Sequence, residues 1–403
     1  MRRCKLGEIA DICLGKMLDK EKNKGNYQPY LANINVRWGS FDLQNLSLMR
    51  FETTEQERYG LKYGDIVMCE GGEPGRCAIW RDELPNMKIQ KALHRIRVHS
   101  DIDSRYIYYW FLLAGRNHLL DGSFIETTIK HLTGDRLKLI ELELPSNSKQ
   151  KQISDVLEKL DEKIALNNRV NATLEAMAKT LYDYWFVQFD FPDEKGRPYK
   201  TSGGKMVYNE ELGREVPAGW EVKRLLDIAT LFDSERIPLS SKEREIKKGT
   251  IPYYGATGIL DYVDEAIFDG VYLLIAEDGS VEMPNGNLVL QYIWGKAWVN
   301  NHAHILQGIP PYSTEYLFLA LRHTKTRQSM TGSIQKKVTQ DNLKNIKLVC
   351  PSNPNIFILF QKYISTFFDM YKRCCEENRR LAALRDWLLP MLMNGQVGFR
   401  KGF

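Results

Sequence analysis

The sequence lacks the cysteine spacing that a structural zinc site or a disulfide framework needs. Its seven cysteines are an odd number, and no two of them form a CxxC pair. Secreted disulfide-linked folds normally carry an even number, and zinc sites normally use closely spaced pairs. The sequence also has no run of eighteen apolar residues, and its first residues, MRRCKLGEIADICLG, contain no signal-peptide core. We therefore expect a reduced, cytoplasmic protein without a membrane span.

Motifs that carry catalysis or bind a cofactor are missing as well. There is no GxxxxGK[ST] loop for a nucleoside triphosphate, no FxGxG-like cofactor loop and no [ND]PP[FY] catalytic turn. The string NPNIF at 353–357 comes nearest to that turn but has no second proline. A nuclease-like set, Pro192-Asp193 with Glu221 and Lys223, falls in a linker and at the start of a globular part, not on paired strands. We expect no catalytic centre and no cofactor in this chain.

One pair of histidines, His302 and His304, has the spacing of two side chains on one face of a strand. Zinc would need one or two further ligands, and no cysteine or carboxylate cluster lies nearby in the sequence. Hydrogen bonds within a loop and contacts to bases are the alternative roles. His94 occupies the comparable place in the first half of the chain, and we expect no metal site in either half.

The charge balance permits nucleic-acid binding but does not require it. The net charge is +5 over 403 residues, and the hydrophobic content of 43% is ample for a core. Many enzymes have a similarly mild positive charge. A chain of this length predicts two or three domains.

The chain contains an internal repeat. Residues 132–145 read LTGDRLKLIELELP and residues 338–351 read VTQDNLKNIKLVCP, with seven identities in fourteen gap-free positions. A weaker match aligns LGEIADI at 6–12 with LLDIATL at 225–231. Similarity at corresponding places indicates a duplicated domain.

A long segment with coiled-coil spacing follows each repeat, because core positions alternate in steps of four and three. In the first segment these positions are Ile153, Leu157, Leu160, Ile164, Asn167, Asn171, Leu174, Ala178, Leu181 and Trp185. In the second segment they are Phe360, Ile364, Phe367, Tyr371, Cys374, Asn378, Leu381, Arg385, Leu388 and Leu392. The second set departs from the apolar pattern by a charge at Arg385. We expect two long helices that pair as an antiparallel coiled coil.

Two asparagines occupy the same heptad position near the middle of each segment, Asn171 and Asn378. A polar asparagine on such a seam lowers stability but selects the register. In an antiparallel pair the two midpoints face each other, so these residues are expected to pair as register-setting groups. Exposure of each side chain to solvent is the alternative.

The globular parts are predicted to be α+β, with mostly antiparallel sheets. Short runs such as 64–69, 77–80, 94–98, 272–279 and 287–295 lie between Gly, Asn and Pro residues and are typical of strands. One helix is expected in each part, at 104–117 and 313–324. The expected layout is a first domain (1–145), a central helix (146–187), an exposed linker (188–219), a second domain (220–351), a C-terminal helix (352–394) and a tail (395–403).

Several phrases of the second half are characteristic of a known family. They are YYGATGILDYVDEAIFDGVYLLIAEDGSV (253–281), GKAWVNNHAHILQG (295–308) and NRRLAALRDWLLPMLMNGQV (378–397). With them, and in the order of its parts over nearly its whole length, the chain resembles the specificity subunit of type I restriction–modification systems.

The resemblance implies that the two globular parts are target recognition domains, each reading one half of an asymmetric, bipartite site in double-stranded DNA. The two helices would be the spacer between them and the docking surface for two modification subunits. Those partners would hold S-adenosylmethionine and methylate adenine. Restriction motor-nuclease subunits would supply the reaction that uses ATP and Mg. A helix of about 40 residues is roughly 60 Å long, enough to hold two readers on separated half-sites.

Candidate DNA contacts are polar and basic residues on loops of the globular parts. Arg and Lys pair with guanine edges or phosphates, and Asn or Gln pairs with adenine. In the first domain we expect contacts from Asn33, Asn35, Arg37, Glu73, Arg76, Lys88, Gln90 and Lys91. In the second domain we expect them from Tyr254, Thr257, Asp278, Ser280, Gln335, Lys336 and Lys337. For each of these, a solvated surface role is the alternative.

Aromatic residues near the helix ends are candidates for docking partner subunits. They are Tyr182, Tyr184, Trp185, Phe186 and Trp387. Packing within the chain is the alternative, since interfaces and cores favour the same side chains. At the level of the whole protein, the alternatives are a self-contained DNA methyltransferase or nuclease, an interaction protein without a DNA role, and a decoy subunit without partners.

Overall fold

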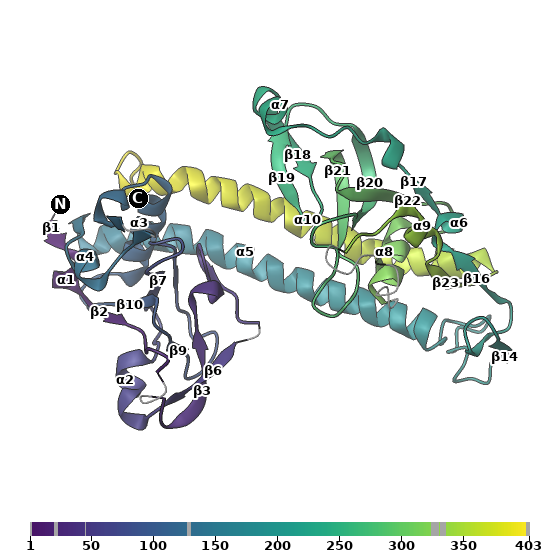
Figure 1. The fold of residues 1–403 in the computed structure, drawn as a ribbon, viewed down its shortest axis with the longest axis horizontal. Helices are drawn as coiled ribbons and strands as arrows, with labels where there is room; N and C mark the ends of the chain where they lie inside the picture. The colour runs from purple at the N-terminus through teal and green to yellow at the C-terminus, as the bar shows by residue number, and fades with distance from the viewer. Residues whose placement is uncertain are drawn as a thin grey trace. The chain divides into compact units, whose positions relative to one another are not determined.

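The computed structural model describes residues 2–19, 23–44, 46–126, 130–323, 330 and 336–399 (Figure 1). The chain forms two compact units. The first unit contains residues 1–166 and 377–403, and the second contains residues 167–376. Each unit therefore consists of one globular domain and a part of each of two long helices.

The first domain is built on a four-stranded antiparallel sheet of order β2-β10-β7-β8. These strands are β2 (Ala10–Leu14), β10 (Leu93–Val98), β7 (Ile66–Cys69) and β8 (Cys77–Ile79). Helix α3 (Ser104–Arg116) shares their core with a row of buried aromatic and aliphatic side chains. The predicted strands and the predicted helix of this domain are confirmed to within a few residues.

Shorter elements complete the first domain. A second sheet has the order β6-β3-β9, made of β6 (Ser47–Phe51), β3 (Asn26–Leu31) and β9 (Lys88–Ile89). The others are β1 (Arg2–Lys5), α1 (Leu6–Ile9), β4 (Val36–Arg37), β5 (Ser40–Phe41), α2 (Gln56–Tyr59), β11 (Ile125–Glu126), β12 (Lys130–His131), α4 (Gly134–Lys138) and β13 (Glu141–Leu144).

The second domain contains a six-stranded sheet of order β17-β22-β20-β21-β18-β19, in which only the β18–β21 pair is parallel among the described residues. Its strands are β17 (Ala229–Leu231), β22 (Ala303–Gly308), β20 (Phe268–Ala276), β21 (Leu290–Val299), β18 (Lys248–Tyr254) and β19 (Ile259–Val263). The remaining elements are β16 (Trp220–Arg224), α6 (Leu225–Ile228), α7 (Ser241–Ile246), α8 (Thr314–His323), α9 (Gln340–Lys344) and β23 (Lys347–Pro351).

The internal repeat provides the last strand of each domain, which pairs with the first strand of the same domain. In the first domain β1 pairs with β13, with Arg2 opposite Leu144. In the second domain β16 pairs with β23, with Trp220 opposite Pro351. The similar sequences at 132–145 and 338–351 therefore encode the same helix and closing strand, and each domain begins and ends in one strand pair.

The two long helices pack together antiparallel in each unit (Figure 1). They are α5 (Asn147–Tyr182), which continues into a short π-helix (Asp183–Val187), and α10 (Pro354–Met393). In the first unit Asp161 meets Arg385 at 2.7 Å, and Lys163 meets Glu377 at 3.1 Å. In the second unit the rings of Trp185 and Phe360 lie 5.4 Å apart. Every predicted heptad position is buried or half-buried, so the coiled-coil prediction is confirmed.

The predicted pairing of Asn171 with Asn378 joins residues of different units and stays a prediction. The amide nitrogen of Asn171 donates to the Sγ of Cys375 at 3.3 Å, three residues before the expected partner. The Oδ1 of Asn171 is buried and has no hydrogen-bond partner among the described residues. Heptad spacing gives the buried face of each helix but does not by itself give the offset between the two helices.

The linker expected to be an exposed loop is partly folded. Residues Met206–Asn209 (β14) and Arg214–Pro217 (β15) form an antiparallel hairpin. Phe189 and Phe191 are buried and their rings lie 5.1 and 5.3 Å from that of Trp220. Aromatic residues in a Gly- and Pro-rich segment thus anchor it to the second domain.

Among the residues that the structure describes, no helix has both the length and the apolarity needed to cross a bilayer.

Candidate nucleic-acid interface

Four side chains form a hydrogen-bonded cluster on loops of the first domain. Three of them are predicted DNA contacts, and the fourth, Trp38, was not predicted. Asn33 is in the turn before β4, and Glu73 and Arg76 are in the loop between β7 and β8. The Arg76 guanidinium donates to the Asn33 side chain at 2.8 Å, to the Asn33 carbonyl at 3.0 Å and to Glu73 at 2.9 Å. The indole nitrogen of Trp38 donates to the second oxygen of Glu73 at 2.5 Å.

These bonds give Glu73 and Arg76 different roles. The Arg76 side chain is only 16% exposed, and its two terminal nitrogens donate to its own neighbours. The Glu73 side chain is 52% exposed, and its carboxylate is held in place from both oxygens. A carboxylate oxygen accepts more than one hydrogen bond, so Glu73 can still accept from the amino group of a base. Arg76 and Trp38 therefore position an acceptor at the surface.

The loop that carries Glu73 depends on glycine. Gly72 and Gly75 adopt φ values of +75° and +89°, a region that other residues rarely occupy. A Cβ on Gly75 would also lie 2.8 Å from the side chain of Leu120. The GGEPG segment (71–75) is therefore a tight turn, and its geometry sets the position of Glu73.

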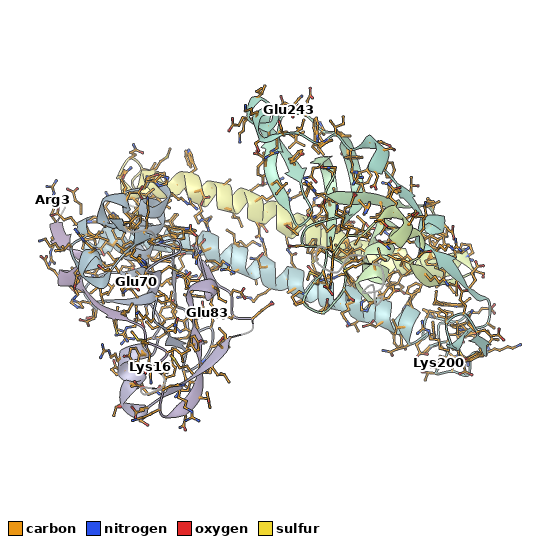
Figure 2. All side chains as sticks on the ribbon, in the orientation of Figure 1. Arg3, Lys16, Glu70, Glu83, Lys200 and Glu243 are labelled. Carbon is orange, nitrogen blue, oxygen red and sulfur yellow. The ribbon has the colours of Figure 1, made fainter. Side chains whose placement is uncertain are left out.

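Other predicted contacts of the first domain lie at its surface. Arg37 is about half exposed and forms an ion pair with Asp42 at 3.6 Å. Gln90 is half-buried, and Lys91 is exposed. Lys91 lines an open pocket of about 350 Å³ with Lys16, which lies close to α2 in Figure 2. Lys16 is itself buried and bonded to Glu55 at 2.5 Å.

Three predicted contacts are buried and are withdrawn as base-reading residues. Asn35 accepts from the backbone of Ala32 at 2.9 Å and closes its own turn. Lys88 is 2% exposed, donates to the carbonyl of Asn86 at 2.9 Å and has its pKa lowered by burial. Tyr254, in β18, is 7% exposed and belongs to the core of the second domain. Residue type alone did not reveal that these polar side chains point inward.

The remaining candidates of the second domain lie on loops at the ends of its strands. Thr257 and Ser280 are exposed. Asp278 bonds to the Nδ1 of His302 at 2.7 Å. Lys336 forms an ion pair with Glu282, and Lys337 is exposed. Gln335 lies outside the described residues.

Sequence reasoning missed a buried ionic cluster in this domain. His304 bonds to Asp233 at 2.6 Å, and Arg236 bonds to Glu277 at 2.6 Å and approaches Asp233 at 3.3 Å. Asp233, Glu277 and His304 are close enough together to ligate a metal. However, Arg236 already pairs with both carboxylates, and both nitrogens of His304 face acceptors. This arrangement is an internal ion network and leaves a metal ion no open ligand from the histidine.

The aromatic candidates at the helix ends divide into two groups. Tyr182, Trp185 and Phe186 are buried in the core of the second unit, where the rings of Phe186 and Phe360 lie 4.9 Å apart. For these three, packing within the chain is the role that the structure shows. Tyr184 is 37% exposed and Trp387 is 56% exposed, so both remain available at the surface of the helices.

Comparison with known proteins identifies the family of this chain, which carries two domains and two long helices. A family model described as the type I restriction modification DNA specificity domain matches residues 2–176 and again residues 217–384. The chain belongs to the type I restriction-modification DNA specificity family. The two matches correspond to the two halves of the internal repeat. The chain is thus a specificity subunit, the non-catalytic component that determines the recognition site of a type I system.

Relatives and a solved structure agree with this family over nearly the full length. The chain is 24% identical over 353 residues to the type I restriction enzyme MjaIX specificity subunit of Methanocaldococcus jannaschii, covering 83% of this chain and 78% of the relative. It is 23% identical over 416 residues to the HindI specificity subunit of Haemophilus influenzae, covering 85% and 88%. A type I specificity-subunit structure from M. genitalium has the same fold, with a TM-score of 0.57, 17% identity and coverage of 100% and 96%.

Proposed function

We propose that this specificity subunit reads a bipartite, asymmetric site in double-stranded DNA, with one half-site for each globular domain. The observation that carries the proposal is the duplication: each unit holds one domain that is closed by one strand pair and joined to the same two helices. The two domains differ in their loops and sheets, so the two half-sites differ in sequence. We keep the domain boundaries 1–145 and 220–351 for these two readers.

In the first domain, we propose Glu73 as a base contact and Arg37, Gln90 and Lys91 as further DNA contacts. Asn33 and Arg76 belong to this surface as residues that position Glu73. In the second domain the proposed contacts are Thr257, Asp278, Ser280, Lys336 and Lys337, and Gln335 remains a prediction. Exposure and loop position support each choice, because base edges and phosphates are reached from loops and surface side chains.

The paired helices are proposed to keep the two readers apart and to dock two modification subunits. Tyr184 and Trp387 support this role, because they are large rings exposed on α5's continuation and on α10. The S-adenosylmethionine for adenine methylation would be bound by the modification subunits. The restriction motor-nuclease subunits would bind ATP and Mg. With seven cysteines outside disulfide bonds, the chain suits a reducing cytoplasm, where these partners and the chromosome meet.

Mapping methylated adenines in a genome tests this function directly. Cells that lack other type I systems would express this chain with the modification subunits from its own locus. We expect one asymmetric motif in two parts, separated by unread bases, with one modified adenine in each part. Exchange of residues 220–351 for a related domain should change one part of the motif only. A continuous palindromic motif, or a change in both parts, would contradict the proposal.

A further inference from the structure

The same buried histidine contact occurs in both domains. In the first domain, the Nε2 of His94 lies 3.0 Å from the carbonyl oxygen of Leu132. In the second, the Nε2 of His304 lies 2.7 Å from the carbonyl oxygen of Val338. Both histidines are 1% exposed. Leu132 and Val338 are the first residues of the repeated segments, so the contact is part of the duplication.

The backbone around this contact is duplicated as well. The amide of Leu132 donates to the carbonyl of Glu70 at 2.8 Å, and the amide of Val338 donates to the carbonyl of Glu277 at 2.9 Å. Glu70, labelled in Figure 2, follows β7, and Glu277 follows β20. In each domain, therefore, one histidine and one backbone carbonyl hold the start of the segment that leads to the closing strand.

The two domains differ at the other nitrogen of the histidine. Leu14 lies opposite His94 in the β2–β10 pair, and the Nδ1 of His94 is buried without a partner among the described residues. Asp233 takes the place of Leu14 in the second domain, where it bonds to the Nδ1 of His304 at 2.6 Å. Gln340, which corresponds to Gly134 in the repeat, donates to the same carboxylate at 2.9 Å. The second domain thus has Asp233 and Gln340 where the first has Leu14 and Gly134. His304 and Gln340 both bond to the same carboxylate oxygen of Asp233.

These contacts assign different charge states to the two histidines. A carboxylate and a carbonyl can only accept hydrogen bonds, so both nitrogens of His304 must carry a proton. His94 needs a proton on Nε2 alone and can be neutral. Three charged groups face His304: Asp233 beside it, Glu277 at the end of β20, and Arg236, which pairs with both carboxylates. Glu70 is the charged group near His94.

The expected pKa directions agree with this assignment. Burial lowers the pKa of His304, but the bonds to Asp233 and Val338 and the nearby negative charges raise it above its ordinary value overall. Burial lowers the pKa of His94, and Glu70 and the Leu132 carbonyl offset only part of that effect. A histidine with a raised pKa contributes stability that is complete below its ordinary value and is lost as the pH rises through the raised one.

We propose that His304 is a protonated positioning residue that ties residues 336–344 to the sheet, so that the second reader, but not the first, loosens at alkaline pH. The link to DNA reading rests on the proposed function, because Lys336 and Lys337 lie on this segment. When His304 loses its proton, one of its two hydrogen bonds is lost, and Asp233 and Glu277 are left with Arg236 as the one positive charge that pairs with them, so the cluster keeps one uncompensated negative charge. His94 is neutral throughout this range and its contact is unaffected.

Hydrogen exchange of the full chain tests the positioning without any DNA. Exchange would be followed by mass spectrometry between about pH 6 and 9, with rates corrected for intrinsic pH dependence, a range that lies mainly above the ordinary histidine pKa of about 6.5. We expect protection of 336–344 to fall as the pH rises, while protection of the matching segment 130–138 stays constant. Asp233→Asn should lower the protection of 336–344 already at neutral pH. Constant protection of 336–344 across this range would overturn the proposal.

Histidine nitrogen chemical shifts provide a second measurement that does not depend on folding of a variant. In the full chain labelled at histidine nitrogens, His304 should carry two protons at neutral pH and His94 one. His304→Gln and His94→Gln would serve only to assign the signals. If His304 proves neutral at neutral pH, the proposal is wrong.

Duplex binding then connects the segment to recognition. Once the two half-sites are known, affinity is measured with each half-site mutated in turn. With only the second half-site intact, log affinity should fall with pH at a slope approaching about −1, as release of one proton requires. With only the first half-site intact, the slope should be near zero. Loss of protection without any DNA binding would contradict the proposed function alone, and DNA binding with equal slopes would contradict the role of His304.

Discussion

Replacement of Asp161 by alanine should destabilise the first unit through the network that joins three of its helices. Asp161 on α5 accepts a hydrogen bond at 2.7 Å from Arg385 on α10. Its other oxygen accepts one at 2.7 Å from the hydroxyl of Tyr109 on α3. The side chains of Asp161 and Arg385 are 13% and 22% exposed, and Tyr109 is fully buried. Water therefore cannot readily replace the lost carboxylate.

The magnitude follows from these contacts. A hydrogen bond to a charged group contributes about 1.5–3 kcal/mol, and removal of one partner from a buried ion pair costs about 3–5 kcal/mol. Arg385 keeps a second partner, because Asp386 lies 2.9 Å from its guanidinium. We therefore expect the free energy of unfolding of the first unit to fall by about 3 kcal/mol.

Urea unfolding of the full chain, followed by circular dichroism and fluorescence, measures this loss. Because the chain forms two compact units, the data are fitted to two transitions. Asp135→Ala is the matched control: its side chain is 93% exposed and, within the described part of the chain, its ion pair is with Lys138, so no measurable change is expected. A double change of Asp161 and Arg385 to leucine should recover much of the stability. An Asp161→Ala variant as stable as the control would refute the reasoning.

Four further outcomes are expected. Glu73→Gln should lower methylation through the first half-site about tenfold and leave domain-two recognition unchanged in the same genomic map, because it removes a charged acceptor. Trp387→Ala should weaken co-purification with the modification subunit without shifting the urea midpoint, since the ring is exposed. Phe186→Ala should lower the free energy of unfolding of the second unit by about 3–5 kcal/mol, since its ring is 3% exposed. Burial raises the pKa of Asp233, but bonds from His304 lower it overall, so acid titration should destabilise the second unit as the pH falls through that pKa, and Asp233→Asn should remove this dependence.

Much of the fold could be predicted because it follows from periodic features of the sequence. Steps of four and three placed the buried faces of α5 and α10, including Arg385, whose charge is satisfied by Asp161. The repeat at 132–145 and 338–351 indicated the duplication because a closing strand pair constrains many consecutive residues. Features of this kind depend on neighbours in sequence, which a single chain displays directly.

The site was less predictable, because burial and pairing depend on neighbours in space. Lys88 and Asn35 have the residue types of DNA contacts, yet both point inward. Trp38 was missed because an indole that holds a carboxylate looks like any other aromatic residue in the sequence. Asp233 could have been found: alignment of the two repeats places it opposite a shared histidine, where the first copy has Leu14.

The pairing of β1 with β13, and of β16 with β23, has a consequence for inheritance. Since Arg2 stands opposite Leu144 and Trp220 opposite Pro351, the chain enters and leaves each globular domain through two adjacent paired strands. A gene segment that encodes everything between two such strands can be exchanged as a unit, because the junction with the helices stays the same strand pair. Recombination could then give a cell a new half-site in a single event.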